Sequence, residues 1–199
     1  MKIMFVEVVK KIDDFNIDKI NFNKLPTKIM LAYSVQYKKL AKILKKKLGK
    51  RIVGFKQVLG CSKLKSKYPI LLIGSGKFHA IQLALQGNKV YLLEGKKISK
   101  LGEKEIKKIK TRRKTAKIKF LAADKIGILV SCKLGQENLK EALKWKKNLE
   151  KQGKEVYIFV TDNINITELE NYDIQSWLNT ACPALTTDSK IVNVNEIEQ

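Results

Sequence analysis

Short runs of apolar, often β-branched residues alternate along the chain with longer segments whose apolar residues recur at helical spacing. The short runs are typical of strands and the longer segments of amphipathic helices. This alternation predicts an α/β fold, with mainly parallel sheets flanked by helices because the strands are apolar almost throughout. The predicted strands are residues 3–9, 28–34, 51–55, 69–75, 89–95, 125–131, 155–160 and 176–180, and the predicted helices are residues 36–49, 78–86, 102–121 and 136–152.

The last predicted helix carries an apolar stripe. Leu139, Leu143, Trp145 and Leu149 follow one another at roughly helical spacing, between lysines and glutamates. Such a stripe is far more typical of a face packed on the core than of a binding surface. We therefore expect these four side chains to be buried.

The sequence contains an internal repeat. Residues 25–34 (LPTKIMLAYS) align with residues 122–131 (AADKIGILVS), and each copy continues into a basic helix, a Gly-Lys turn and a second strand. The repeat predicts two related α/β domains, at residues 25–97 and 98–199. Residues 1–24 fit neither copy, and we expect them to be the remnant of a preceding domain together with a linker.

Two of the three cysteines follow the second strand of a repeat copy. Cys61 and Cys182 would thus occupy equivalent positions at the carboxyl ends of strands, where ligand sites gather in open α/β sheets. Two thiolates at one site would suit a soft metal or an iron–sulfur cluster. The alternative is a pair of buried thiols, which spacing alone favours because there is no CxxC. Cys132 aligns with Val35 instead, which favours a buried or incidental thiol.

A glycine pair lies at a predicted junction between strand and helix. Gly74 and Gly76 flank Ser75 in "IGSGKFHA", where they would let a ligand approach backbone amides and the start of the helix would favour an anion. The third glycine of the dinucleotide fingerprint is replaced by His79, so the motif alone is weak. Because the chain has one histidine, a zinc site is disfavoured, and hydrogen bonding to a ligand suits His79 better.

The segment around Cys182 offers further polar groups. Pro183 follows the thiol and, with its fixed φ, can hold the direction of the cysteine. Asp188 either caps a turn or holds a ligand amine through a charge-assisted hydrogen bond. We find no Ser-His-Asp triad and no pair of carboxylates suited to acid–base chemistry in the sequence.

The chain is strongly basic, with 41 Lys and Arg against 19 Asp and Glu and a net charge of +22. The lysines are spread over several predicted helices, which favours solvated helix faces over a dedicated RNA site. Residues 111–114 (TRRK) are the best local candidate for an anionic partner.

No apolar run reaches the roughly 20 residues that span a bilayer, and the N-terminus carries charges too early for a secretory signal. We therefore expect a cytoplasmic protein without a membrane partner.

Four segments together resemble a known family. These are "KQVLGCS" (56–62), "IGSGKFHAIQLAL" (73–85), "GILVSCKLGQ" (127–136) and "NTACPALTTD" (179–188), which occur in the same order as in the diphthamide biosynthesis enzymes. Members of that family are 2-(3-amino-3-carboxypropyl)histidine synthases. The chain resembles their C-terminal two domains.

The resemblance implies a fold, a cofactor and a reaction. The family has three similar α/β domains, each of which gives one cysteine to a [4Fe–4S] cluster. The cluster cleaves S-adenosylmethionine in a radical reaction, and a 3-amino-3-carboxypropyl group is transferred to a histidine of translation elongation factor 2. By resemblance, Cys61 and Cys182 are cluster ligands. The residues expected near S-adenosylmethionine are Gly74, Ser75, Gly76, His79, Gln136 and Asp188.

The chain also departs from the family pattern. The first domain is absent except for the strand at 3–9, and Ala184 stands where the family usually has arginine. We expect a split enzyme, in which a separate N-terminal chain docks on that strand and supplies the first domain and the third cysteine, within a dimer or heterotetramer. Replacement of the third ligand by Cys132 is less favoured. A non-catalytic accessory subunit and a basic RNA-binding α/β protein are the alternatives.

Overall fold

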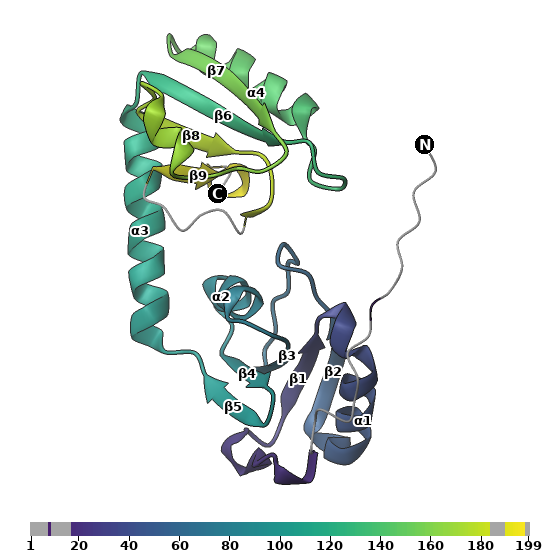
Figure 1. Cartoon of the computed structure of the whole chain (residues 1–199). Coiled ribbons are helices and arrows are strands. Elements are labelled where there is room, and N and C mark those ends of the chain that lie inside the picture. Colours follow the sequence, from purple (N-terminus) through teal and green to yellow (C-terminus); the bar gives the residue numbers. More distant parts are fainter. Residues whose placement is uncertain (1–7, 9–16, 184–189, 198–199) are drawn as a thin grey trace. The chain divides into compact units, whose positions relative to one another are not determined.

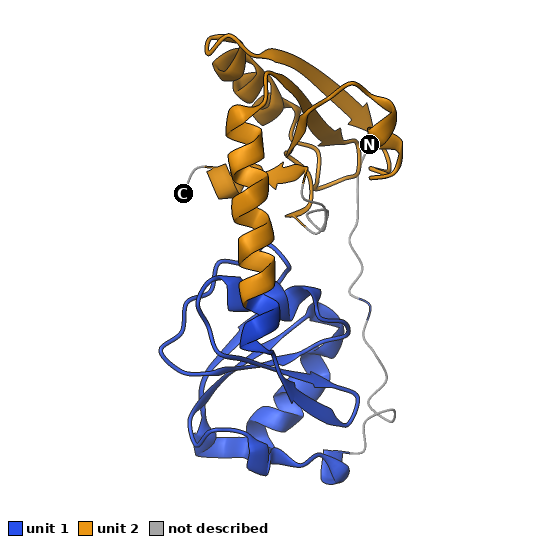
Figure 2. Ribbon diagram, turned by 90° about the vertical axis from the view of Figure 1, so that its left-hand side faces the viewer, with its two compact units in different colours: residues 1–106 blue, residues 107–199 orange. Residues whose placement is uncertain are grey.

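The chain folds into two compact units, residues 1–106 and 107–199, each built on its own sheet (Figures 1 and 2). The computed structural model describes residue 8 and residues 17–183 and 190–197. Almost all of the predicted strand at 3–9 lies outside these described residues. The units divide after Ile106, inside helix α3, whereas the sequence predicted a boundary between residues 97 and 98.

Unit 1 contains a five-stranded sheet in the order β2-β1-β3-β4-β5. The first four strands are parallel, and β5 pairs with β4 in an antiparallel hairpin. The sequence did not predict β5, because its four residues, KISK, carry one apolar side chain. The elements are β1 (Ile29–Tyr33), α1 (Lys38–Leu48), β2 (Ile52–Gln57), β3 (Ile70–Ile73), α2 (Phe78–Leu85), β4 (Val90–Glu94) and β5 (Lys97–Lys100).

Both faces of the unit 1 sheet are buried. Leu31 and Ile73 face α1 and pack against helix residues such as Leu44. Their neighbours in the strands, Ala32 and Leu72, face α2 on the opposite side. Because successive strand residues point to opposite faces, burial of both faces explains why these strands are apolar almost throughout.

Unit 2 contains a parallel four-stranded sheet in the order β7-β6-β8-β9. Helices α3 and α4 pack on one face of the sheet. The other face is covered by the connection between β7 and β8, whose Ile164, Ile166 and Leu169 pack near Trp177. The elements are α3 (Glu103–Ala122), β6 (Lys125–Ser131), α4 (Leu139–Glu150), β7 (Glu155–Thr161), β8 (Ser176–Asn179), β9 (Ile191–Asn193) and α5 (Val194–Ile197).

Five short 3-10 helices complete the described secondary structure. They are η1 (Ile17–Lys19), η2 (Phe22–Lys24), η3 (Val35–Tyr37), η4 (Gly49–Arg51) and η5 (Glu168–Asn171).

Gly127 leaves room for the largest fully buried side chain of unit 2, that of Trp177, to lie over the neighbouring strand. Gly127 on β6 pairs with Trp177 on the neighbouring strand β8. A Cβ atom at Gly127 would lie 2.3 Å from the Trp177 ring, far inside van der Waals contact. The indole also meets the ring of Phe159, with 4.8 Å between centroids. The absent side chain therefore makes room for this aromatic packing.

The predicted α/β fold with mainly parallel sheets is confirmed. The predicted stripe on α4 is half right, because Trp145 and Leu149 do pack against the core of unit 2. Leu139 and Leu143 are 41% and 53% exposed. The buried face instead carries Ala142, Trp145 and Leu149, which recur at intervals of three and four residues. The face of α4 that carries Leu139 and Leu143 therefore points away from the sheet.

Candidate functional site

The predicted site residues that the structure describes lie in loops after the carboxyl ends of parallel strands in both units. In unit 1, Cys61 follows β2, and residues 74–79 follow β3, which is separated from β2 in the sheet by β1. In unit 2, Cys132 follows β6 and Cys182 follows β8, its neighbour in the sheet. Since parallel strands end at the same edge, each unit places its candidate residues along one edge of its sheet.

The sequence had suggested that Cys61 and Cys182 occupy equivalent positions in the repeat. The structure shows that they do not. The strand orders of the two sheets correspond, so β2 matches β7 and β3 matches β8. Cys61 comes after the second strand of its unit, whereas Cys182 comes after the third. Cys182 therefore occupies the position that the loop beginning at Gly74 has in unit 1. The repeat assignment missed this because it counted Cys182 from the strand at 155–160, although a further strand was predicted at 176–180.

Hydrogen bonds close the turn that carries Cys61. The Val58 N–H donates to the Tyr33 carbonyl oxygen at 2.9 Å, which extends the pairing of β1 and β2. The Ser62 N–H then donates to the Leu59 carbonyl at 3.0 Å, while the Ser62 hydroxyl oxygen accepts from the Leu59 N–H at 2.7 Å. Cys61 lies inside this closed turn, and the residue is exposed. The alternative of a buried thiol at this position is therefore wrong.

Gly60 brings the Cys61 turn against the helix that follows the glycine pair. A Cβ atom at Gly60 would lie 2.2 Å from Cε1 of Phe78. Only a residue without a side chain can lie this close to the ring. The structure thus brings Cys61 next to the "GSGKFH" segment, two features that are separated in the sequence.

Two amide side chains that the sequence did not single out hold the loop after Cys61. Gln86 accepts from the Leu64 N–H at 2.8 Å and donates to the Ser62 carbonyl at 3.0 Å. Asn88 accepts from the Ser66 N–H at 3.0 Å and donates to the Leu64 carbonyl at 2.7 Å. Both residues flank the turn after α2. These contacts satisfy backbone groups that have no strand partner.

The glycine pair forms a tight turn, and an internal carboxylate binds one of its amides. Gly76 has φ +72°, a left-handed conformation that favours glycine. Its N–H donates to Oε1 of Glu94 at 2.7 Å. Ser75 is exposed beside it, and Gly74 is buried. The sequence predicted that backbone amides at this turn bind an anionic ligand. In this structure, the Gly76 amide instead donates to Glu94.

His79 lies half-buried in the first turn of α2. Its ring contacts the edge of Phe78, with 5.4 Å between centroids. Desolvation by burial lowers the pKa of His79 below its ordinary value, because burial disfavours the charged imidazolium. The imidazole is therefore neutral at pH 7 and can both donate and accept a hydrogen bond.

The turn at Cys182 is held by a buried asparagine. Asn179, at the end of β8, is 2% exposed. Its Oδ1 accepts from the Ala181 N–H at 3.0 Å, and its Nδ2 donates to the Cys182 carbonyl at 3.0 Å. Thr180 adds a hydrogen bond from its hydroxyl to the Leu129 carbonyl at 2.8 Å. The backbone on both sides of the thiol is thus fixed to the sheet.

A polar network extends from this turn to α3. Asn179 donates to Oδ1 of Asn193 at 2.8 Å, and Asn193 donates to Oε1 of Glu196 at 2.9 Å. The same carboxylate oxygen lies 3.0 Å from Nη1 of Arg113. Arg113 belongs to the "TRRK" segment that the sequence proposed for an anionic partner. One of its two arginines therefore serves the internal network.

Cys132 and Gln136 flank an exposed turn. The Cys132 N–H donates to the Thr161 carbonyl at 3.0 Å, and the residue is exposed. Cys132 was predicted to be either a buried or an incidental thiol, and the buried alternative is therefore wrong. Gly135, with φ +76°, completes the turn, in which the Gln136 N–H donates to the Lys133 carbonyl at 2.9 Å. The Gln136 side chain is exposed.

The thiols offer the right donor type for an iron–sulfur cluster. Cys61, Cys132 and Cys182 are free, and none of them is fully buried. Thiolates on loops are the usual ligands of such clusters. Within the described ranges 17–183 and 190–197, the structure contains no group of three or more Cys, His, Asp or Glu side chains arranged to hold a metal. Asp188 and Ala184 lie outside those ranges.

Comparison with known proteins connects these loops to a family. A family model described as diphthamide synthesis protein matches residues 1–192. The chain belongs to this family. The predicted resemblance is therefore confirmed over nearly the whole sequence.

Two curated relatives carry the same name, 2-(3-amino-3-carboxypropyl)histidine synthase. The protein of this diphthamide synthesis family from Pyrococcus horikoshii is 33% identical over 135 residues. That from Methanocaldococcus jannaschii is 29% identical over 171 residues. The matches cover 66% and 83% of this chain but only 40% and 47% of the relatives. The matched part is thus less than half of either relative.

Solved structures of the family share the fold. A crystal structure of Dph2 from Pyrococcus horikoshii with a 4Fe-4S cluster matches with a TM-score of 0.75 and 28% identity, covering 88% of this chain and 57% of that one. A second structure of the same protein also gives a TM-score of 0.75, at 27% identity, and covers 96% of this chain and 62% of that one. No helix among the described residues is long and apolar enough to cross a membrane.

The amide side chains of Gln86 and Asn88 should control the mobility of the Cys61 loop. We expect Gln86→Ala to speed hydrogen exchange of the Leu64 amide, and Asn88→Ala that of the Ser66 amide, by about five- to tenfold, because each loses a hydrogen bond worth about 1 kcal/mol. NMR-detected exchange measures this directly. Asn148→Ala, on the exposed face of α4, is the control and should leave both rates unchanged. Equal rates in all variants would contradict the assigned role.

Stability should depend on pH through His79. Because its folded pKa is lowered, the unfolded chain binds a proton more readily below about pH 6.5. The free energy of unfolding of unit 1 should therefore fall as the pH drops from 6.5 through the folded pKa. Urea unfolding between pH 5 and 7.5 measures the effect. His79→Gln should flatten this part of the profile; an unchanged profile would show that other groups cause it.

Proposed function

We propose that this chain supplies two domains of an enzyme that transfers a 3-amino-3-carboxypropyl group from S-adenosylmethionine to a histidine of translation elongation factor 2. Membership of the diphthamide synthesis family and the names of the curated relatives support the general reaction. The observation that carries the proposal is the placement of Cys61 and Cys182. Each is a free thiol in a hydrogen-bonded loop at the carboxyl end of a parallel strand.

Cys61 and Cys182 would each give one thiolate to a [4Fe–4S] cluster. A structural relative with 28% identity contains such a cluster, and the thiols of this chain have the required chemistry. When bound, the cluster would supply an open iron site and an electron for cleavage of S-adenosylmethionine. The chain itself contributes two turns that are held in place by hydrogen bonds. This matters because a thiolate on a mobile loop binds metal less tightly than one on a fixed loop.

In unit 1, the "GSGKFH" segment would contact S-adenosylmethionine. The substrate carries an amine, a carboxylate and a sulfonium cation. The neutral His79 can donate a hydrogen bond to the carboxylate, and Ser75 offers an exposed hydroxyl. Glu94, already bound to the Gly76 amide, has further acceptor capacity for the amine. Gln136 and Asp188 stay predicted contacts.

A third thiolate would come from a separate N-terminal chain. The curated relatives are more than twice as long as their matched parts, so the family fold includes residues that match nothing in this chain. We propose that such a chain carries the first domain and its cysteine, and that the complex is a dimer or heterotetramer. The alternative within this chain is Cys132, which is exposed just after the carboxyl end of β6 and could give the third thiolate itself.

Anaerobic reconstitution with iron and sulfide tests the proposal. We expect Cys61→Ala and Cys182→Ala each to lose most of the bound iron, whereas Cys132→Ala, the matched control, retains it. Iron content and visible absorbance would be measured with and without the N-terminal chain. Transfer of the 3-amino-3-carboxypropyl group leaves methylthioadenosine, whose release measures the reaction.

Each outcome decides a different point. Unchanged iron in both Cys61→Ala and Cys182→Ala would overturn the assignment of the ligands. Loss of iron in Cys132→Ala would make that cysteine the third ligand and remove the need for the separate chain. Bound iron without methylthioadenosine, in the presence of the N-terminal chain and a reductant, would indicate an accessory subunit.

A further inference from the structure

A basic pocket of about 570 Å³ lies in unit 1, apart from the cysteine loops. One wall is the segment that precedes β1, and the other is the turn that joins β4 to β5. We propose that this pocket binds a compact polyphosphate. The polar residues and turn glycine that line it are Lys19, Asn21, Lys24, Gly95, Lys96 and Lys97.

The lining concentrates positive charge. Lys19 and Lys24 come from one wall and Lys96 and Lys97 from the other, and none of the described residues that line the pocket is acidic. All four lysines are exposed. Within the described part of the chain, none of them takes part in a salt bridge. Like charges so close together repel one another, and a multivalent anion would relieve that repulsion.

Two carboxylates that adjoin the pocket in sequence are bound elsewhere. Asp18 precedes Lys19, but its Oδ1 lies 2.6 Å from Nζ of Lys47 on α1. Glu94 precedes Gly95, but its Oε1 accepts from the Gly76 N–H at 2.7 Å. Neither carboxylate lines the pocket. A ligand in the pocket would therefore not contact either carboxylate as a lining group.

The walls of the pocket are held in place before any ligand binds. Nη2 of Arg51 lies within hydrogen-bonding distance of the carbonyls of Phe22, Leu25 and Pro26, at 3.2, 2.8 and 3.1 Å, and so ties the first wall to the end of η4. The second wall is a two-residue hairpin turn in which Gly95 has φ +58°. The backbone of the walls therefore loses little conformational entropy on binding.

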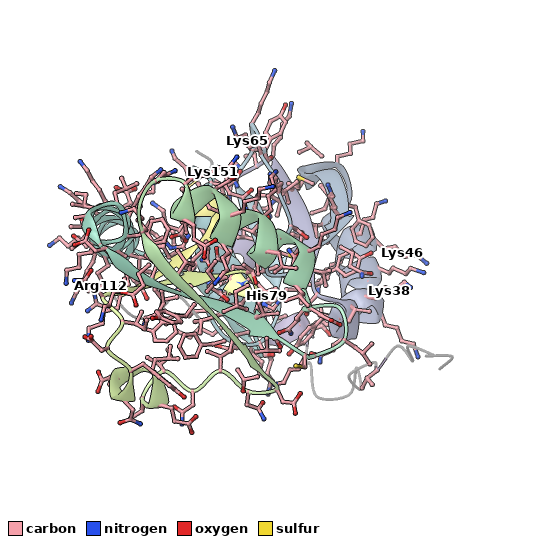
Figure 3. All side chains as sticks on the ribbon, turned by 90° about the horizontal axis from the view of Figure 1, so that it is seen from above. Lys38, Lys46, Lys65, His79, Arg112 and Lys151 are labelled. Carbon is pink, nitrogen blue, oxygen red and sulfur yellow. The ribbon has the colours of Figure 1, made fainter. Side chains whose placement is uncertain are left out.

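The shape and chemistry of the pocket favour a small phosphate ligand. Its volume is within the range of about 300–1,000 Å³ usual for small-molecule sites. Lysine ammonium groups bind phosphate oxygens as point charges, and a ligand with several phosphates can reach both walls at once. Other lysines of unit 1, such as Lys46 and Lys65, extend outward from the ribbon (Figure 3) and do not line the pocket.

Titration calorimetry of the full chain with inorganic tripolyphosphate at low ionic strength tests the proposal. We expect one site per chain, with inorganic phosphate bound at least about tenfold more weakly because it meets fewer lysines. Lys24→Gln/Lys96→Gln should weaken tripolyphosphate binding by about tenfold or more. Lys144→Gln/Lys147→Gln, on the exposed face of α4, changes the net charge equally and should alter binding less than about twofold.

The controls separate this pocket from general basicity. Equal weakening by both double variants would overturn the proposal, since it would show that only net charge matters. Binding of a short single-stranded RNA without binding of tripolyphosphate would also overturn it and would indicate a nucleic-acid surface instead. All four substituted lysines are exposed, so unchanged thermal unfolding would confirm that the variants fold. The proposal is independent of the cluster and of the synthase function.

Discussion

Parallel strand pairing is the constraint on which the candidate site depends. In unit 1, β2 and β3 both pair in parallel with β1, and in unit 2, β6 pairs in parallel with β8. All of these strands end at one edge of their sheet. Residues that are far apart in sequence, such as Cys61 and His79, are consequently brought to a common edge. An antiparallel partner would place one of the loops at the opposite edge.

The same edge creates a second requirement, because backbone groups beyond the strand ends lose their partners. Asparagine and glutamine satisfy them: Gln86 and Asn88 in unit 1, and Asn179 in unit 2. Each side chain both donates and accepts, so it can bind the N–H and carbonyl groups of a turn together. These contacts make the cysteine turns part of the fold. Such rigidity is what a metal ligand needs from its protein.

The sequence predicted the long and strongly patterned elements well. Strands such as β6 and helices such as α1 have clear apolar periodicity, and the glycine turn with His79 was placed correctly after β3. Short elements such as β5 and β9 carry too few residues for a pattern. The amide side chains that hold the cysteine loops were also missed. Gln86, for example, bonds to a residue 22 positions away, and sequence spacing carries no signal for that contact.

The errors at the cysteines have a structural origin. Spacing along the chain made Cys61 and Cys182 appear equivalent, whereas strand order places them after different strands. Cys132 was predicted to be a buried or incidental thiol, because it aligns with Val35 in the repeat. It is exposed, since it comes after the last residue of β6, where the buried part of the strand ends. Whether such a residue is buried depends on where the strand ends, and the apolar pattern of the sequence predicts strand ends poorly.

We infer that the proposed cluster needs the hydrogen bonds that hold the cysteine turns as well as the thiols themselves. Iron bound by the Asn179→Ala variant after anaerobic reconstitution tests it most directly, because all cysteines stay in place. The matched control is Asn165→Ala, whose side chain accepts from the Thr167 N–H in a similar turn away from the cysteines. We predict that Asn179→Ala, shown to be folded by circular dichroism, loses most of its iron while Asn165→Ala retains it. Equal iron in both variants would contradict the account.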